Sequence, residues 1–527
     1  MTTSPAGPGV ETQWQRLDQR MLLVHPIREL LRFLPVLVGL FFFSNRDSSG
    51  SDVRWQLLGI AFPVALGILR YFTTSFRISE GRIELKRGLL NKHVLSTRLE
   101  RVRTVELTAQ PIQRLLGLTT VRVGTGTAST SEADRLDLDG LPVDRARRLR
   151  ADLLHAAPAT IEESPTIEGT VATDEPGGRE AVVAPPVRVV LRLDPAWARF
   201  APLTSSGLVA TVAILGVGSQ VLDGFGTGPR VDVDPAASGF GVPWSLALVA
   251  IPVLVAGMSV LAVAGYLVSN WGFTLTHAAR DGSWHLRRGL VTTRETSLDD
   301  ERVSGISIGE PIGLRLVRGG RLSAIVTGLD RQASGSSMLV PPAPQTVVTG
   351  VAGQVLGADE PVTSELRSHG PRARTRRFSR ALVPTGLLSL ALILAVVAGA
   401  PPWLLVGAVI LPAIGAALAA DRARSLGHTL TERHFVARSG SLFRQRQALE
   451  TTAIIGWNFR SSWFQRRAGL TTLSATTAGG SQSVTALDVP ENDAVGVAAT
   501  AVPGLVDQFL VDQPRADQHV VDQPASG

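Results

Sequence analysis

Basic side chains recur in two stretches of alternating apolar and polar residues, and they are the groups of this 527-residue chain best suited to bind an anion. Guanidinium and ammonium groups form charge-assisted hydrogen bonds with phosphate and carboxylate oxygens. We therefore treat both groups as candidates for a lipid or partner surface, the alternative being a solvated strand face beside an anionic membrane. The first group is Arg82, Lys86, Arg87 and Lys92, and the second is Arg280, Arg287, Arg288 and Arg294.

A third basic cluster comes immediately before an apolar stretch. Near an anionic leaflet each basic residue contributes ~1 kcal/mol of attraction. Arginine beside a membrane span also keeps that end of the span on the cytoplasmic side. Lipid attraction and control of topology therefore both explain the cluster, which is Arg372, Arg374, Arg376, Arg377 and Arg380.

Other stretches invite a catalytic or metal-binding interpretation but lack the residues that it requires. Gly124-Thr125-Gly126 has neither the later glycine nor the downstream acid of a dinucleotide site. His428 and His434 have no third ligand nearby, and the absence of cysteine excludes thiolate metal sites and cysteine nucleophiles. We expect no enzyme activity, no catalytic residue, no metal and no cofactor.

A repeated pattern of residues positions the basic groups. Residues 80–89 read EGRIELKRGL, residues 281–290 read DGSWHLRRGL, and residues 435–442 form a fainter copy, FVARSGSL. The register aligns Gly88, Gly289 and Gly440. Self-similarity over this distance predicts three copies of one structural segment.

The same register continues beyond the glycines. Gln110-Pro111-Ile112 is echoed by Glu310-Pro311-Ile312, and residues 464–472 mirror residues 112–120. This alignment places Pro111, Pro311 and Trp463 at one position. Alternating apolar residues predict hairpins within each copy. A closing helix is expected over residues 142–156, 344–356 and 493–510.

Each copy follows a pair of apolar stretches, and a transmembrane helix needs ~20 mainly apolar residues. With 44% hydrophobic residues, the chain fits a mixture of membrane helices and water-facing domains. Arg32 interrupts the first stretch, so the first pair either spans fully or forms a shallow hairpin. The six predicted helices cover residues 30–43 and 55–72, 203–222 and 243–268, and 381–399 and 402–420.

Arginine is abundant before and after each pair and sparse in the connections inside the pairs. The positive-inside rule therefore places both termini and the three β-rich segments in the cytoplasm. The net charge of +7 would also attract nucleic acid, but arginine clustered beside apolar helices favours anionic lipid. We expect the chain to bind membrane lipids and either a protein partner or a second copy of itself, but no nucleic acid.

These features together resemble the bacterial PH-like membrane proteins of the YdbS/YdbT type. The resemblance is carried by the helical pair, the Glu-Gly turn, the Arg-Gly-Leu step and the Leu-Gly-Leu turn of residues 116–118. It implies that each segment is a curved β-roll capped by a C-terminal helix. It also implies a link with envelope stress or resistance to membrane-active peptides.

The predicted fold is an α+β membrane protein in which three transmembrane helical hairpins alternate with three PH-like β-roll modules, each closed by a C-terminal helix. Its predicted function is non-catalytic binding of protein or lipid at the cytoplasmic leaflet of the bacterial inner membrane. The alternative is a transporter or peptide exporter with regulatory PH-like domains. The predicted regions are a cytoplasmic segment 1–25, hairpin 26–72, module 73–156, acidic linker 157–187, hairpin 188–270, module 271–357, basic linker 358–380, hairpin 381–420, module 421–510 and tail 511–527.

Overall fold

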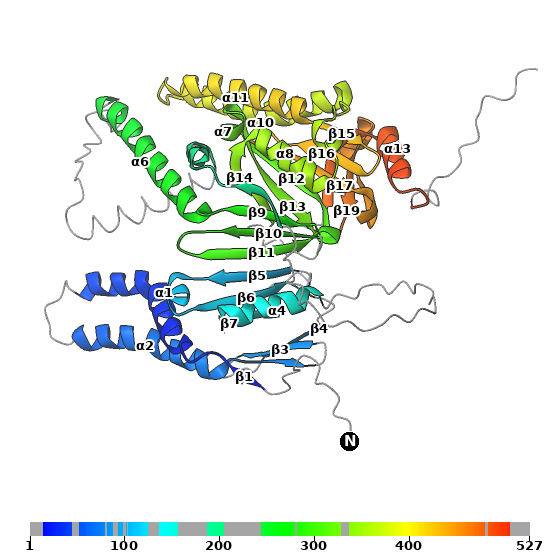
Figure 1. Ribbon diagram of the computed structural model, residues 1–527. Coiled ribbons are helices and arrows are strands. Elements are labelled where there is room, and N and C mark those ends of the chain that lie inside the picture. Colours follow the sequence, from blue (N-terminus) through cyan, green and yellow to red (C-terminus); the bar gives the residue numbers. More distant parts are fainter. Residues whose placement is uncertain are drawn as a thin grey trace, which may run out of the picture. The chain divides into compact units, whose positions relative to one another are not determined.

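A computed structural model gives two compact units, which are described separately (Figure 1). The first comprises Met1–Gly357 with Ala478–Ser481, and the second comprises Ala358–Thr477 with Gln482–Gly527. Within them the structure describes residues 14–44, 52–79, 82–87, 93–98, 102, 104–124, 136–155, 187–204, 244–279, 282–327, 337–479 and 483–505.

Long helices occupy much of the predicted apolar pairs. In the first unit α1 (Met21–Ser44) packs against α2 (Asp52–Thr73), and α6 (Trp244–Asn270) follows later. In the second unit α10 (Gly370–Val397) packs against α11 (Leu404–Ser425). Within the described residues, α10 and α11 are the two helices long and apolar enough to cross a membrane.

Two predicted regions, the helix over residues 203–222 and the basic linker 358–380, need comment. The first lies almost entirely outside the described residues, and the second differs from the prediction. The predicted helix over residues 203–222 falls almost entirely outside the described residues, while Pro195–Leu203 forms the 3-10 helix η3. The segment predicted as a basic linker contains the short helix α9 (Glu360–Thr363) and the first turns of α10. Pro371 is in the first turn of α10, where a missing N–H costs no helical hydrogen bond.

The first β-rich segment begins with a four-stranded antiparallel sheet and continues with three further strands around a short helix. The sheet consists of β1 (Gln15–Arg16), β2 (Ser75–Ser79), β3 (Arg82–Arg87) and β4 (His93–Arg98). The rest of the segment is β5 (Thr104–Ala109), α3 (Pro111–Leu115), β6 (Leu118–Gly124), β7 (Leu136–Pro142) and the closing helix α4 (Val143–His155).

The second segment has the same order of elements, and β8 (Val187–Arg192) pairs with its first strand as β1 does in the first segment. Its β11 pairs with β5 of the first segment, so that one seven-stranded antiparallel sheet contains strands of both (Figure 1). The remaining elements are β9 (Thr274–Ala278), β10 (Ser283–Arg288), β11 (Thr293–Asp299), η4 (Asp300–Arg302), β12 (Val303–Pro311), α7 (Ile312–Leu316), β13 (Gly319–Val326), β14 (Met338–Pro344) and α8 (Gln345–Leu356).

The third segment lies in the second unit and repeats this order. Its buried core includes Phe435, Leu449 and Leu473, and Phe435 meets the Trp457 ring edge to face at 5.2 Å between centroids. The elements are β15 (Gly427–Leu430), β16 (His434–Ser439), β17 (Phe443–Glu450), η6 (Thr451–Ala453), β18 (Gly456–Arg460), α12 (Trp463–Arg467), β19 (Leu470–Thr476), β20 (Ser483–Pro490) and α13 (Glu491–Ala501).

The last strand of every segment carries a register shift at the same place, just before its final two residues. The shift puts residues 139–140, 341–342 and 487–488 opposite Thr120, Arg321 and Thr472, respectively. A bulge of this kind bends the strand and redirects a side chain. In each segment the bulge meets a helix of an apolar pair, as described below.

The positions of the short helices show that the predicted alignment of the second segment with the first is wrong by one residue at this point. Trp463 and Ile312 are the first residues of α12 and α7, as Pro111 is of α3, whereas Pro311 precedes its helix. The predicted pairing of Pro111 with Pro311 is therefore wrong. Both positions accept proline because the first N–H groups of a helix have no partner within it.

Candidate functional site

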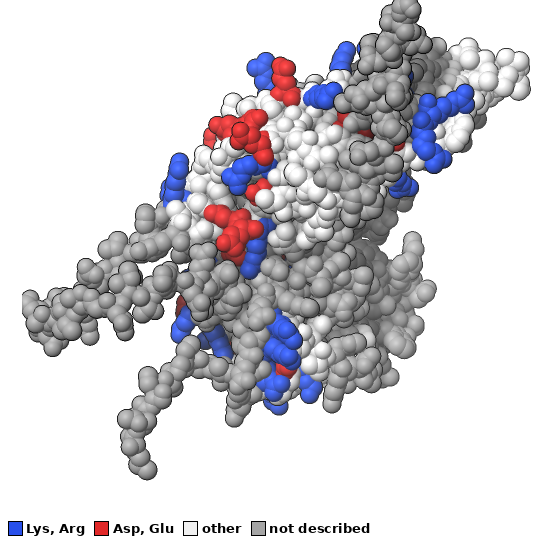
Figure 2. All heavy atoms as spheres, turned by 90° about the vertical axis from the view of Figure 1, so that its right-hand side faces the viewer, with Lys and Arg blue, Asp and Glu red and all other residues white. Residues whose placement is uncertain are grey.

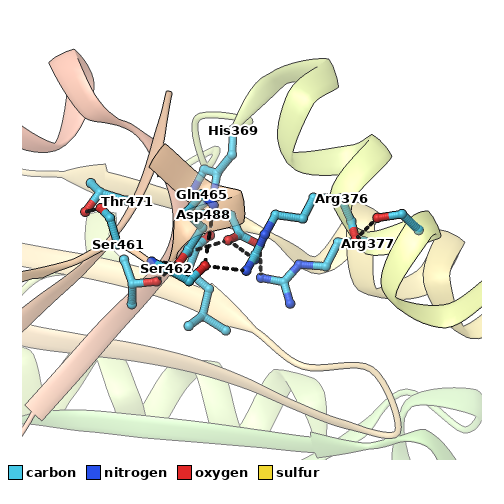
Figure 3. Close-up of polar contacts among 11 residues, drawn as sticks. His369, Arg376, Arg377, Ser461, Ser462, Gln465, Thr471 and Asp488 are labelled. Atoms are coloured by element: carbon cyan, nitrogen blue, oxygen red, sulfur yellow. Dashed lines mark hydrogen bonds and ion pairs between the residues drawn. The ribbon is translucent and has the colours of Figure 1, made fainter. Parts of the chain in front are cut away.

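Asp488 is the centre of a buried polar cluster that attaches α10 to the third segment (Figure 3). It lies in the bulge of β20 with φ of 57°, and its side chain is inaccessible to solvent. Arg376 and Arg377, from the first turns of α10, both form ion pairs with its carboxylate. The Gln465 side chain donates a third contact, from Nε2 to Asp488 Oδ1 at 2.7 Å.

The cluster places two guanidinium groups around one carboxylate with little exposure to water. The exposed fractions of the Arg376 and Arg377 side chains are 14% and 12%. Charges removed from water are tolerated when they are paired and their remaining polar atoms are hydrogen-bonded. This arrangement fixes the start of an apolar helix rigidly to a β-rich segment.

Gln465 links the same cluster to the short helix α12. Its Oε1 accepts a hydrogen bond from the Ser462 N–H at 2.9 Å, and the Ser462 hydroxyl in turn accepts from the Gln465 N–H, which completes a capping box. Gln465 Nε2 also donates to the Thr472 hydroxyl at 2.9 Å. Arg376 reaches Ser462 Oγ at 3.4 Å, so α12 lies next to the first turns of α10.

The other predicted arginines of this region stay exposed. Arg372, Arg374 and Arg380 lie on the surface of α10, and Arg422 and Arg424 lie on the last turn of α11. Because the two helices are joined by the short connection at residues 398–403, these five residues gather at one end of the apolar pair. The structure thus divides the predicted cluster into two largely buried arginines that hold the helix and three exposed ones that are available to an anionic surface.

The first predicted basic group is only partly described. Arg82 is exposed on β3, and the Lys86 ammonium lies 5.7 Å from the centroid of the Trp14 ring. Arg77 lies over the same ring and pairs with Glu84. The Arg87 side chain, Lys92 and Arg280 lie outside the described residues.

The second predicted group is largely paired with acids on neighbouring strands, between β10 and β11 and between β11 and β5. Arg287 lies 3.6 Å from Glu295, and Arg294 lies 4.0 Å from Glu106. Burial lowers the pKa of Arg288, and the nearby Arg294 lowers it further. Figure 2 likewise shows basic and acidic side chains interspersed on the face that it draws. The described members of this group therefore belong to a charge network of mixed sign.

A second polar feature of the third segment is a pair of buried histidines. His428 Nδ1 lies 2.9 Å from His369 Nε2, and His369 Nδ1 lies 2.8 Å from the Leu487 carbonyl oxygen. The carbonyl can only accept, so His369 donates to it and accepts from His428. His428 Nε2 is then an acceptor, and it has no partner among the described residues. Burial lowers the pKa of both rings, that of His428 to about 4.

A pocket of 440 Å³ adjoins His428 and is bordered by β15 and α13. Arg367 and Asp493 at this pocket pair with each other at 3.1 Å. His434, by contrast, is buried in β16 and bonds to Thr431 through its backbone. Within the described residues no three metal-ligating side chains come together.

Sequence reasoning missed Asp488, Gln465 and His369. A signal for Gln465 existed, because the alignment of residues 464–472 with 112–120 matches it to Gln113, which is also buried and bonds to Thr120 at 3.1 Å. No comparable signal marked Asp488, because the loop before its strand differs in length between segments. His369 acquires its role only through contacts with residues distant in sequence.

Comparison with known proteins gives one family. Residues 33–157 and 387–498 match the bacterial PH domain family, whose members are generally non-catalytic binding modules. No curated protein and no solved structure matches the chain. The matching regions, together with α10 and α11, fit a membrane-associated PH-domain protein.

Proposed function

We propose that this chain is a non-catalytic integral membrane protein of the bacterial inner membrane that presents three PH-like modules at the cytoplasmic leaflet to bind protein or lipid. The recurrence of one order of strands, short helix and closing helix supports three modules. The family matches in residues 33–157 and 387–498 support the PH-like character of the first and third.

The observation that carries the proposal is the attachment of α10 through Asp488. A binding module on a flexible linker samples a large volume, but a module bonded to the first turns of a membrane helix stays at the membrane surface. The exposed arginines Arg372, Arg374 and Arg380 lie at the same end of the apolar pair. Anionic lipid attracts such residues to the cytoplasmic leaflet.

Three modules on one chain also raise the effective concentration of each for a shared surface. Once one module is engaged, the next binds in an intramolecular step, so weak contacts add up to avidity. Ion pairs such as Arg287 with Glu295 leave individual modules with modest net attraction. Multivalent contact is therefore the mode of binding that we assign to the intact chain.

The test uses the absence of cysteine from the chain. Ala400→Cys, between α10 and α11, should react with an impermeant thiol reagent in intact cells. Glu432→Cys, in the exposed turn after β15, should react only after lysis. Labelling of Glu432→Cys in intact cells would overturn the cytoplasmic placement of the third module.

A transporter that moves ions or protons would require ionisable side chains at bilayer depth. Residues 381–420, which contain the apolar parts of α10 and α11, include no Asp, Glu, Lys, Arg or His. This pair therefore supports anchoring of the module.

A further inference from the structure

Each of the three equivalent short helices exposes large apolar side chains, at the first two residues of α12 and at the last residue of α3 and of α7. Trp463 and Phe464 of α12 are 57% and 70% exposed. Leu115 of α3 and Leu316 of α7 are 87% and 80% exposed. Isolated exposed apolar residues are ordinary, but their recurrence on equivalent helices indicates a surface with a common role.

On α12 the apolar residues belong to a compact patch that is both aromatic and basic. The Trp463 and Phe464 rings meet edge to face, with centroids 4.9 Å apart. The Arg467 guanidinium lies 5.7 Å from the Trp463 ring centroid, and Arg466 is exposed beside it. Aromatic rings with adjacent cations suit the boundary between lipid headgroups and acyl chains.

Each short helix also lies beside the start of an apolar stretch. Arg376 ties α12 to α10 through Ser462, and Arg20, just before α1, donates to the Leu116 carbonyl after α3 at 2.9 Å. In the second segment α7 packs on η3, where a Cβ added to Gly313 would lie 2.5 Å from the Leu203 carbonyl oxygen.

The depth of α12 follows from helix geometry. Arg376 precedes Ala381, the first residue of the uninterrupted apolar run, by five residues, which is ~7.5 Å along an α-helix. The headgroup layer on each side of a bilayer is about 5–8 Å thick, from the difference between total and hydrocarbon thickness. The contact between Arg376 and Ser462 therefore places α12 at the level of this layer.

We infer that α12 inserts Trp463 and Phe464 into the interfacial layer of an anionic bilayer, at the end of the apolar pair where α10 begins. The inference rests on the proposed membrane anchoring by α10 and α11. Arg466 and Arg467 contact the headgroups while the two rings contact the upper acyl chains. This interfacial anchor gives the third module a second attachment to the leaflet, beside the one through Asp488.

The experiment reconstitutes the full-length chain, bearing one cysteine at a time, in vesicles of phosphatidylethanolamine and phosphatidylglycerol. A polarity-sensitive fluorophore is attached at Phe464→Cys and, independently, at Trp463→Cys, so that each variant keeps the other ring. Leu394→Cys, on the exposed surface of α10, reports on the span, and Glu432→Cys reports on the aqueous side. Quenching is measured with lipids brominated near the headgroup or near the chain terminus.

Labels at positions 463 and 464 should be quenched by shallow bromines, the label at Leu394 by deep bromines, and the label at Glu432 by neither. If Leu394 is quenched but positions 463 and 464 are not, the interfacial anchor is refuted and the membrane span stands. If Leu394 is not quenched, the proposed anchoring by α10 fails instead. A label at Phe464 that is shielded from water but not quenched by either lipid would show a protein contact and also overturn the inference.

A separate double variant tests whether the two arginines of the patch contact lipid headgroups. Arg466→Gln with Arg467→Gln should reduce shallow quenching at position 464 in anionic vesicles and leave it unchanged in zwitterionic vesicles. Equal quenching in both lipids for the parent and the variant would remove the headgroup contact from the inference.

Discussion

The second and third segments have the same backbone bulge and use it with opposite chemistry. In the third, the bulge residue is Asp488, which binds two arginines of α10 and the buried Gln465. In the second, the equivalent residues are Pro342 and Leu314, and the Pro342 carbonyl accepts a hydrogen bond from Tyr266 of α6 at 2.9 Å. A polar core in one segment corresponds to an apolar core in the other.

The first segment shows a third solution at the same position. Gly140 occupies the bulge with φ of 73°, and a Cβ there would collide with the Met21 side chain of α1 at 2.2 Å. The bulge therefore provides a constant docking point for a helix of an apolar pair. The residue at the bulge is matched to the residue that the helix presents: glycine to methionine, proline to tyrosine and aspartate to arginine.

At a second core position, too, the third segment has a polar residue where the first and second have apolar ones. Strand pairing makes Phe76 and Leu275 equivalent to His428, and all three are buried. The third segment thus replaces an apolar core residue by a histidine that is paired with His369. This difference predicts that the third segment, unlike the second, is sensitive to loss of charge at the bulge and to protonation of the core histidine.

The largest expected effect is at Asp488. Asp488→Asn keeps a residue that tolerates a positive φ but removes the charge, so two nearly buried guanidinium groups lose their counterion. We expect a loss of about 3–5 kcal/mol of stability, by analogy with breaking one side of a buried pair. Thermal unfolding in detergent and faster amide exchange in the first turns of α10 would measure it.

The matched control is the exposed pair of Arg433 and Glu450, whose arginine side chain is 76% exposed. Glu450→Gln should cost less than about 1 kcal/mol, as surface ion pairs do. Asp488→Gly gives the third segment the residue of the first and separates loss of charge from backbone strain. If Asp488→Asn behaves like Glu450→Gln, the cluster does not hold α10.

Acid should loosen the third segment before the second. The unfolded chain protonates His428 near its ordinary pKa of 6.5, whereas the folded segment does so only near 4, because burial opposes the charge. The contribution of His428 to the free energy of unfolding is therefore complete above pH 6.5. It falls as the pH is lowered toward 4, by about 3 kcal/mol at most. The unfolding midpoint at pH 7 and pH 5 gives the slope.

His428→Leu installs the residue of the second segment and should flatten this pH dependence, leaving the part that comes from His369. His434→Ala is a poor control because that ring is also buried and its pKa is also lowered by burial. His277 is the better control, because its side chain is 24% exposed and pairs with Asp300 in the second segment. An unchanged slope in His428→Leu would contradict the assignment.

Gly289 of the second segment and its counterpart Gly440 of the third should be equally sensitive to substitution. Gly289 and Gly440 have φ of 107° and 106°, and an added Cβ would lie 2.0 and 2.1 Å from the carbonyl oxygen three residues later. Alanine at either should cost about 1–3 kcal/mol through backbone strain. Gly350→Ala in the closing helix α8, where nothing lies near, should instead stabilise by about 0.5–1 kcal/mol. Unequal losses of stability on substitution of Gly289 and Gly440 would show that the two positions are not equivalent.

The smallest expected effect concerns Arg318, which has φ of 54° where the other segments have Gly117 and Gly469. Arg318→Gly should relieve the strain of a left-handed residue, and the greater freedom of glycine in the unfolded chain offsets part of the gain. We expect stabilisation below about 1 kcal/mol in the same unfolding assay. A loss of stability would show that the Arg318 side chain makes contacts worth more than the strain.

Local features of the fold were predictable because they depend on neighbouring residues. Alternation of apolar residues placed most strands, and the shared register of Gly289 and Gly440 agrees with their shared conformation. The one-residue error at Pro311 has the same origin, because proline is accepted at two adjacent positions of a helix start and the sequence motif did not distinguish them. Of the candidate site, the sequence placed the five arginines next to the apolar run of α10 but did not reveal their separate roles.

The sequence by itself determined where apolar helices, hairpins and basic residues occur, since burial of apolar surface and backbone conformation are written in short-range patterns. Only the tertiary structure decided that Asp488 meets Arg376, 112 residues away, and that β5 pairs with β11. Such contacts depend on how distant strands and helices are brought together, and many residue pairs have the chemistry to form them. The bulge at a fixed strand position selects one pair, because it directs the buried Asp488 carboxylate toward the apolar helix α10.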